Sequence, residues 1–253
     1  MSKTIFSKGI DVSKWQGVIN WQAVKNAGVQ FALIRAGYGD TISYPDQIDE
    51  QFQRNYTECK KVGLPVGAYW YSYATTIESA KREAQSCLKL LAGKQFEYPI
   101  YYDVEEMRIF NSGLTNEIIQ AFCTELENAG YFVGVYIFRS AVQSYLNDRT
   151  RTRYTLAIAE YDNKLNYNGS YDIWQYSSTE KVNGIQTAVD VDYCYIDFPT
   201  IIKQRGKNGY TAKTGAIIAD IGDTFTHAGK VYKVQPRTSV NVSLEGVRNY
   251  EVY

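Results

Sequence analysis

The chain alternates between short apolar runs rich in β-branched and aromatic residues and longer segments with apolar residues every three to four positions. The short runs predict strands and the longer segments predict amphipathic helices. Up to about residue 146 the two kinds alternate five times. The predicted strands are 9–13, 31–38, 66–73, 98–105 and 133–138, and the helices after them are 21–27, 48–62, a helix reaching 92, 116–129 and a shorter one to about 146.

After residue 146 the pattern predicts strands only. Residues 154–161, 172–177 and 189–196 are strand-like and are separated by polar loops rich in asparagine and glycine. Five β/α units followed by three strands give eight strands, the number that closes a small barrel. We therefore predict an α/β fold, an irregular TIM-like (β/α)5(β)3 barrel.

A second domain is predicted at the C-terminal end. The composition changes near Phe198-Pro199, and residues 205–209 are typical of a linker. Short β-type runs follow at 216–221, 231–234 and 239–244, which gives a barrel of residues 1–205 and a small β-rich module of 206–253. The module has six basic residues against four acidic ones, whereas residues 1–205 have 21 against 23.

The most informative run is Tyr101-Tyr102-Asp103-Val104-Glu105, an aromatic, strand-like segment that ends in two carboxylates. In a strand, residues i and i+2 point to the same face, so Asp103 and Glu105 are expected side by side. Burial and mutual repulsion should keep one of them protonated near neutral pH, as glycosidic bond cleavage requires. The alternative is a strand that simply ends in charged loop residues.

Composition removes several classes of function. The formal net charge is zero, so neither a nucleic-acid nor an anionic-membrane partner is indicated. The single histidine, His227, lies in the predicted module, which argues against serine, cysteine and zinc hydrolase chemistry in the barrel. The four cysteines lack metal or redox spacing and are expected to be buried free thiols.

Further carboxylates are predicted near the same end of the barrel. Asp11 lies near the end of the first strand, and Asp190 and Asp192 lie in the eighth, which adjoins the first when the barrel closes. Acidic groups from three strands are then expected in one pocket. Such a cluster without histidine indicates either a glycosidase site or a divalent-cation site.

Six separate motifs together resemble glycoside hydrolase family 25, the Chalaropsis-type lysozymes, in the family's order over about residues 5–200. The motifs are Gly9-Ile10-Asp11-Val12-Ser13-x-Trp15-Gln16-Gly17, Ile34-Arg35-Ala36-Gly37-Tyr38-Gly39, Gly67-Ala68-Tyr69, Tyr102-Asp103-Val104-Glu105, Ile173-Trp174-Gln175-Tyr176 and Val189-Asp190. The resemblance implies a flattened barrel and cleavage of the β-1,4 bond between N-acetylmuramic acid and N-acetylglucosamine. It implies no cofactor and no metal.

The resemblance also implies roles for individual residues. Glu105 matches the general acid, and Asp103 matches the carboxylate that assists the substrate's own acetamido group. Asp11 and Asp190 match further acidic positions of the groove and are included with the catalytic residues. The predicted substrate-binding residues are Tyr69, Trp70, Arg35, Tyr136, Trp174 and Asp192, with the two tryptophans and Tyr69 as platforms for sugar rings.

Two departures from the family pattern occur, Trp70 after the Gly-Ala-Tyr motif and Glu160 where glutamine is common. Residues 1–6 lack the apolar core of a signal peptide, and no run approaches membrane-spanning length. We therefore expect a phage endolysin held in the host cytoplasm until release, with peptidoglycan and wall glycopolymer as partners. The oligomeric state is not predicted.

Three alternatives stay open. The first is a bacterial autolysin or prophage remnant exported by another route. The second is a carbohydrate-binding protein on an inactive barrel, against which the presence of both Asp103 and Glu105 argues. The third is a divalent-metal hydrolase, which a chelator would inactivate.

Overall fold

The computed structural model describes residues 3–212, 224–227 and 230–233 and separates the chain into two compact units, 1–213 and 214–253. In the second unit, β9 (Thr224–His227) and β10 (Lys230–Lys233) form an antiparallel pair, with His227 opposite Lys230. The predicted strand at 231–234 overlaps β10. The strands predicted at 216–221 and 239–244 lie outside the described residues.

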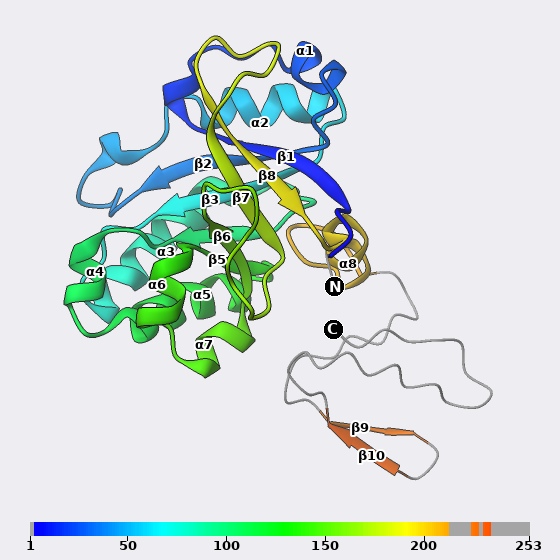
Figure 1. Cartoon of the computed structure of the whole chain (residues 1–253). Helices are drawn as coiled ribbons and strands as arrows, with labels where there is room; N and C mark the ends of the chain where they lie inside the picture. The colour runs from blue at the N-terminus through cyan, green and yellow to red at the C-terminus, as the bar shows by residue number, and fades with distance from the viewer. Residues whose placement is uncertain (1–2, 213–223, 228–229, 234–253) are drawn as a thin grey trace. The chain divides into compact units, whose positions relative to one another are not determined.

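The first unit is built on a closed barrel of eight strands in sequence order (Figure 1). Strands β1 to β7 run parallel to their neighbours, whereas β8 is antiparallel to both β7 and β1. The predicted α/β barrel is therefore confirmed. Its strands are β1 (Ser7–Val12), β2 (Phe31–Tyr38), β3 (Val66–Tyr71), β4 (Ile100–Asp103), β5 (Val133–Phe138), β6 (Thr155–Ala159), β7 (Ile173–Glu180) and β8 (Val189–Cys194).

Eight α-helices accompany these strands within residues 3–212. They are α1 (Trp21–Asn26), α2 (Phe52–Lys61), α3 (Ile77–Leu91), α4 (Met107–Asn111), α5 (Thr115–Asn128), α6 (Arg139–Tyr145), α7 (Asp148–Arg153) and α8 (Phe198–Gln204), with short 3-10 turns η1 (Lys14–Gln16) and η2 (Pro45–Gln47). No helix among the described residues has the length and apolar character needed to cross a membrane.

The expectation that helices end at about 146 is wrong, because α7 and α8 follow. Helix α7 is short and charged and has no apolar period, but Asn147 caps it by accepting a hydrogen bond from the Thr150 amide. Helix α8 starts from an Asp197 cap with a proline in its first turn. The change in composition near Pro199 was thus a helix start and not the end of the domain.

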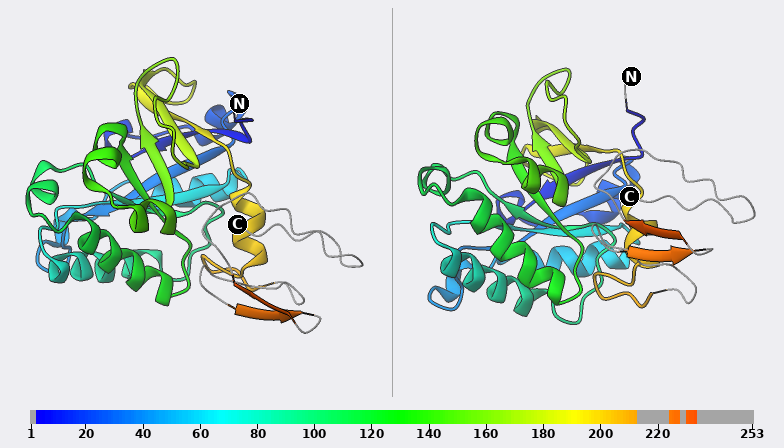
Figure 2. Two further views of the ribbon diagram at one scale, coloured as in Figure 1. Left: turned by 60° about the horizontal axis from the view of Figure 1, so that its bottom comes forward. Right: turned by 90° about the horizontal axis from the view of Figure 1, so that it is seen from below.

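Apolar residues fill two layers, one between the barrel and its outer helices and one inside the barrel at its lower end. In the outer layer, Tyr102 stacks on Phe122 of α5 at 3.8 Å between ring centroids, and α5 packs beside α3 (Figure 2). In the inner layer a Cβ at Gly134 would lie 2.5 Å from the Tyr101 ring, so glycine provides the space for that ring. Strands β7 and β8 face the viewer in Figure 1 with no helix in front of them.

The segment predicted as a linker closes the bottom of the barrel. Asn208 is completely buried, and its side-chain amide donates to the Tyr98 carbonyl (2.9 Å) and accepts from the Phe132 amide (2.7 Å). Tyr210 donates a hydrogen bond to Glu97. Residues 205–209 are therefore not a linker, and the first compact unit extends to 213 instead of 205.

Candidate active site

A cavity of about 290 Å³ opens at the end of the barrel where β1 to β7 finish. Its lining is rich in carboxylates and tyrosines and includes one arginine. The lining residues are Asp11, Val12, Ser13, Trp15, Gln16, Leu33, Arg35, Tyr69, Tyr71, Tyr101, Asp103, Glu105, Tyr136, Tyr161, Gln175 and Asp190.

All four residues predicted as catalytic, Asp11, Asp103, Glu105 and Asp190, line this cavity. Asp11 and Asp190 are direct cross-strand partners in the antiparallel pair of β1 and β8. Because β8 runs the opposite way, its second residue, Asp190, lies at the open end of the barrel. The closure of the barrel thus brings together acids that are far apart in the sequence, as predicted.

The acid pair differs in detail from its prediction. Strand β4 ends at Asp103, so Glu105 lies beyond the strand and the alternation argument does not apply to it. The amide of Val104 still donates to the Tyr136 carbonyl at 2.9 Å, and Val104 is buried. This last contact with β5 turns the half-buried Glu105 toward the same cavity as the buried Asp103.

Burial is the main reason why these carboxyls are hard to ionise. It raises the pKa of Asp103 well above its usual range; the charge of Glu105 acts in the same direction, and the charge of Arg35 opposes both. Burial also raises the pKa of Glu105, assisted by the charges of Glu106 and Asp190. Burial therefore disfavours the ionised form of both members of the pair. The charge of Glu105 acts on Asp103, so the two groups titrate as a pair.

The second acid pair, Asp11 and Asp190, is raised for the same reason. Burial raises the pKa of Asp11 well above its usual range, and the charges of Asp192 and Asp190 add to the shift. Burial also raises the pKa of Asp190. Burial therefore disfavours the ionised form of both members of this second pair.

Arg35 supplies positive charge to the cavity. Its Nε donates to Asp49 Oδ2 at 2.7 Å, and Asp49 is itself fixed by the backbone amides of Lys14 and Gln51. The buried Nη2 of Arg35 has no hydrogen-bond partner among the described residues. Arg35 therefore favours an ionised Asp103 and has a donor left for a bound molecule.

Gln175 connects three cavity residues, although the sequence analysis did not select it. Its Oε1 accepts hydrogen bonds from the hydroxyls of Tyr136 and Tyr161, each at 2.9 Å. Its Nε2 donates to Asp11 Oδ2 at 2.5 Å. The two phenols fix the orientation of the amide, so Asp11 receives a donor that restrains its carboxyl. Gln175 belongs to the motif Ile173-Trp174-Gln175-Tyr176, but the sequence analysis predicted its neighbour Trp174 as the substrate-binding residue.

Of the predicted substrate-binding residues, Tyr69, Arg35 and Tyr136 line the cavity, whereas Trp70 and Trp174 do not. Trp70 is 0% exposed, and its Nε1 donates to the Gly39 carbonyl at 3.1 Å. Trp174 is 8% exposed and donates to the Glu160 carbonyl at 2.8 Å. Adjacent strand residues face opposite sides, so the inward Tyr69 and Gln175 turn both tryptophans outward. The prediction that these tryptophans are sugar platforms is wrong.

Asp192 was also predicted to bind substrate, but it lies deeper in the barrel and does not line the cavity. It is 2% exposed, and its Oδ2 has no hydrogen-bond partner within residues 3–212. Burial, followed by the charge of Asp190, raises its pKa well above the usual range. The charge of Asp192 adds to the upward shift of the Asp11 pKa.

Other cavity residues missed by the sequence analysis are Trp15, Tyr71 and Tyr161. Trp15 follows β1 in the turn η1, is 70% exposed and lies at the rim. A rim tryptophan with a free face is suited to stacking on a sugar ring. Its presence in the first motif was the only signal in the sequence.

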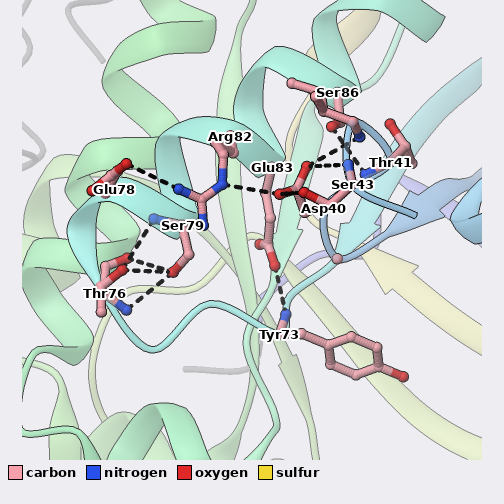
Figure 3. A network of polar contacts seen from close by, with 12 residues as sticks. Asp40, Thr41, Ser43, Tyr73, Thr76, Glu78, Ser79, Arg82, Glu83 and Ser86 are labelled. Carbon is pink, nitrogen blue, oxygen red and sulfur yellow. Dashed lines mark hydrogen bonds and ion pairs between the residues drawn. The ribbon is translucent and has the colours of Figure 1, made fainter. Parts of the chain in front are cut away.

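Helix α3 supports this side of the site (Figure 3). Glu83 accepts a hydrogen bond from the Tyr73 amide at 2.8 Å, just after β3, and another from the Tyr102 hydroxyl at 2.6 Å. Arg82 Nε donates to Asp40 Oδ2 at 2.9 Å, which ties the loop after β2 to the same helix. Burial raises the pKa of Glu83 to about 7. The ends of β2 and β3 are therefore held from outside the barrel.

In the part of the chain that the structure describes, no three histidine, cysteine, aspartate or glutamate side chains are arranged to hold a metal ion. The four cysteines are buried and free, as predicted.

Known proteins share both the sequence and the fold of this barrel. The family model described as Glycosyl hydrolases family 25 matches residues 10–185. The chain belongs to this family. Three of the four catalytic candidates, Asp11, Asp103 and Glu105, lie within the matched range. Asp190 lies five residues past it.

Three relatives illustrate the similarity. The autolytic lysozyme of Clostridium acetobutylicum is 32% identical over 186 residues, covering 73% of this chain and 55% of that protein. The modular autolysin LytC of Streptococcus pneumoniae, solved with a synthetic peptidoglycan ligand, is 30% identical with a TM-score of 0.65, covering 74% and 46%. The CTP1L endolysin is 25% identical with a TM-score of 0.66, covering 79% and 70%. The chain thus spans about half the length of the first two relatives.

Proposed function

We propose that this family 25 glycosidase is an N-acetylmuramidase that hydrolyses the β-1,4 bond between N-acetylmuramic acid and N-acetylglucosamine in peptidoglycan. The observation that carries the proposal is the pairing of buried Asp103 with half-buried Glu105 at one cavity, where burial keeps a carboxyl proton available. The names of the relatives, an autolytic lysozyme and an autolysin bound to a peptidoglycan ligand, support the substrate class.

Each acid has a distinct role in this proposal. Glu105 gives its proton to the departing glycosidic oxygen, because it is the more accessible member of the pair. Asp103, whose ionised form Arg35 favours, orients the substrate's 2-acetamido group as its carbonyl oxygen attacks the anomeric carbon. Water then opens the cyclic intermediate and returns a proton to Glu105. Asp11 and Asp190 hold the sugar from the opposite wall of the cavity.

Digestion of purified peptidoglycan tests the bond that is cleaved. We expect new reducing ends of N-acetylmuramic acid, identified after borohydride reduction and acid hydrolysis. Reducing ends of glucosamine would instead indicate a glucosaminidase. Release of peptides without new reducing ends would indicate an amidase or peptidase and reject the glycosidase mechanism.

We also propose that the enzyme acts as a phage endolysin. The CTP1L likeness supports this role, whereas the Clostridium relative is named as autolytic. An endolysin expressed in a sensitive host should leave the culture intact until the membrane is permeabilised with chloroform, and should then lyse it at once. Lysis without permeabilisation would favour an exported autolysin.

The second unit is proposed to bind the cell wall. It follows a complete set of family motifs. The positive excess counted over residues 206–253 comes from Lys207 and Lys213 of the first unit, so the proposal rests on this position and not on charge. Attachment to an insoluble substrate raises the local concentration of the enzyme.

Truncation after residue 213 is expected to leave a folded barrel that still cleaves soluble peptidoglycan fragments but no longer sediments with intact walls. The cut at 213 keeps Asn208 and Tyr210, which hold the bottom of the barrel. Unchanged wall association would remove the binding role, and an unfolded product would point to a structural role. A cut after 205 should destabilise the barrel, because it removes the buried Asn208 contacts.

A further inference from the structure

The side chain of Gln175 reaches from β7 to an acid of β1 on the opposite side of β8. It is 2% exposed and lines the cavity, and its Nε2 donates to Asp11 Oδ2 at 2.5 Å. In the barrel sheet Gln175 pairs with Ala159 of β6 on one side and with Asp192 of β8 on the other. The backbone is therefore fixed on both sides, and the amide group has a defined position beside Asp11.

Two phenols determine which end of the amide faces Asp11. The Oε1 atom of Gln175 accepts hydrogen bonds from the hydroxyls of Tyr136 and Tyr161, each at 2.9 Å. Burial raises the pKa of Tyr136 well above its usual range and that of Tyr161 to about 12, so both hydroxyls keep their protons at neutral pH and can donate them. Two donors satisfy the two lone pairs of the amide oxygen. The nitrogen, which can only donate, is left to face Asp11.

A donor at this place acts against the other influences on Asp11. Burial, followed by the charges of Asp192 and Asp190 and then that of Asp103, raises the pKa of Asp11, whereas the hydrogen bond from Gln175 lowers it. The amide thus favours the ionised form of a carboxyl that its acidic neighbours would leave protonated. An ionised carboxyl can only accept hydrogen bonds, as the N–H and O–H groups of a sugar require.

We propose that Gln175 is a positioning residue that favours the carboxylate form of Asp11 as an acceptor for the sugar. The two phenols orient the amide, the amide nitrogen donates to Asp11, and the carboxylate then accepts a hydrogen bond from an N–H or O–H of the bound sugar. The use of this acceptor rests on the proposed function, in which Asp11 holds the substrate. The arrangement of amide and carboxylate is present in the protein without substrate.

Charged and titratable groups face Asp11 from several other elements of the barrel. They are Asp190 and Asp192 on β8, Asp103 on β4, Tyr69 on β3, Tyr136 on β5 and Tyr161 after β6. The charge of Arg35 on β2 acts on two of them, Asp103 and Tyr69. A substitution at Gln175 leaves every one of these groups in the protein, so a change in the titration of Asp11 reports the loss of the amide.

Gln175→Met is the deciding variant, because methionine has a similar length but no N–H to donate. We expect the pKa of the Asp11 carboxyl to rise by about one unit, since the carboxylate loses its donor. The measurement is a ¹³C NMR titration of the substrate-free protein, with the Asp11 signal assigned by its absence in Asp11→Asn. If the amide oxygen faced a protonated Asp11 instead, the substitution would lower this pKa. A pKa that falls or stays in place overturns the proposal.

The pH profile of kcat/KM gives a second readout of the same variant. Asp11 should take up a proton at higher pH, so the acidic limb should move to higher pH, whereas the basic limb, which reports the proposed acid Glu105, should stay in place. KM at the optimum should rise more than kcat falls, because the lost interaction concerns the binding of the sugar. An unmoved acidic limb contradicts the proposal. Gln120→Met, an exposed change on α5 outside the cavity lining, is the matched control and should leave both limbs in place.

Tyr161→Phe tests the orientation of the amide and decides the proposal if Gln175→Met does not fold. Tyr161 is 53% exposed, so the loss of its hydroxyl should not destabilise the barrel. One of the two donors that orient the amide is removed, while Gln175 and the Tyr136 hydroxyl remain. The pKa of Asp11 should rise in this variant too, by less than in Gln175→Met. An Asp11 pKa that is unchanged or lower would show that the phenols do not orient the donor.

This result and that of the proposed function can fail separately. The NMR titration needs neither substrate nor turnover. If peptidoglycan digestion gives no muramic acid ends, the bond assignment falls, but the Asp11 titrations still decide the role of the amide. If muramic acid ends appear and the Asp11 pKa is the same in Gln175→Met as in the wild-type protein, the role of Gln175 falls and the proposed reaction stands.

Discussion

Glu105→Gln is expected to stay folded and to lose roughly 10²–10⁴-fold in kcat, the usual contribution of a general acid. Glutamine preserves the shape of the side chain but has no transferable proton. Because burial already disfavours the charged form of Glu105, the neutral amide should not lower the thermal stability. The measurement is the rate of release of reducing ends from peptidoglycan, together with thermal unfolding followed by circular dichroism.

The control for this variant is Glu58→Gln, which removes a half-exposed carboxylate that does not line the cavity and should retain full activity. Residual activity of Glu105→Gln above about a tenth of the wild-type rate lies outside the range expected for a general acid. The proton would then have to come from another carboxyl, and Asp103 would be the first candidate because it lines the same cavity and burial raises its pKa.

Asp103→Asn is expected to reduce kcat by about 10²-fold or more, because a fixed charge beside the reacting centre is lost. It should also move the basic limb of the pH profile to lower pH. In the wild-type enzyme, loss of the last proton from the pair leaves two carboxylates that repel each other, which holds that proton more tightly. A single remaining carboxyl releases its proton more easily. Activity should therefore be lost at a lower pH in the variant than in the wild-type enzyme.

The pH profile of the residual activity of Asp103→Asn decides this point. Asp46→Asn, an exposed change in η2 away from the cavity, supplies the matched control. A basic limb that stays in place or moves up would show that Asp103 and Glu105 titrate independently. The loss of rate would then have to be assigned to the orientation of the substrate alone.

The local pattern was enough to predict the barrel and the acids of the site. Each strand of the barrel is a short apolar run. Asp11 and Asp103 each come after several strand-like residues, so the sequence already places them near the end of a strand. Parallel strands in a closed barrel all finish at the same rim, so acids at strand ends meet without any knowledge of the loops. The elements missed, α7 and α8, are short helices that have no long apolar period.

The direction of individual side chains could not be predicted in the same way. Register shifts between β2 and β3 near Arg35 and between β7 and β8 near Gln175 change which residues face inward. A shift of one residue along a strand turns a side chain from the barrel interior to the surrounding helix layer. The sequence pointed to Trp174, Trp70 and Tyr69, whereas the cavity contains Tyr69 and Gln175 and neither tryptophan.

The sequence by itself determined the order of the strands, the family and the identity of the acid pair, because these depend on residue types and on spacing along the chain. Only the tertiary structure decided which neighbours act on those acids. Burial raises the pKa of Asp103, Arg35 opposes that shift, and Gln175 restrains Asp11. Desolvation and hydrogen-bond direction depend on distances of a few ångströms between distant segments, and only the closed barrel fixes those distances.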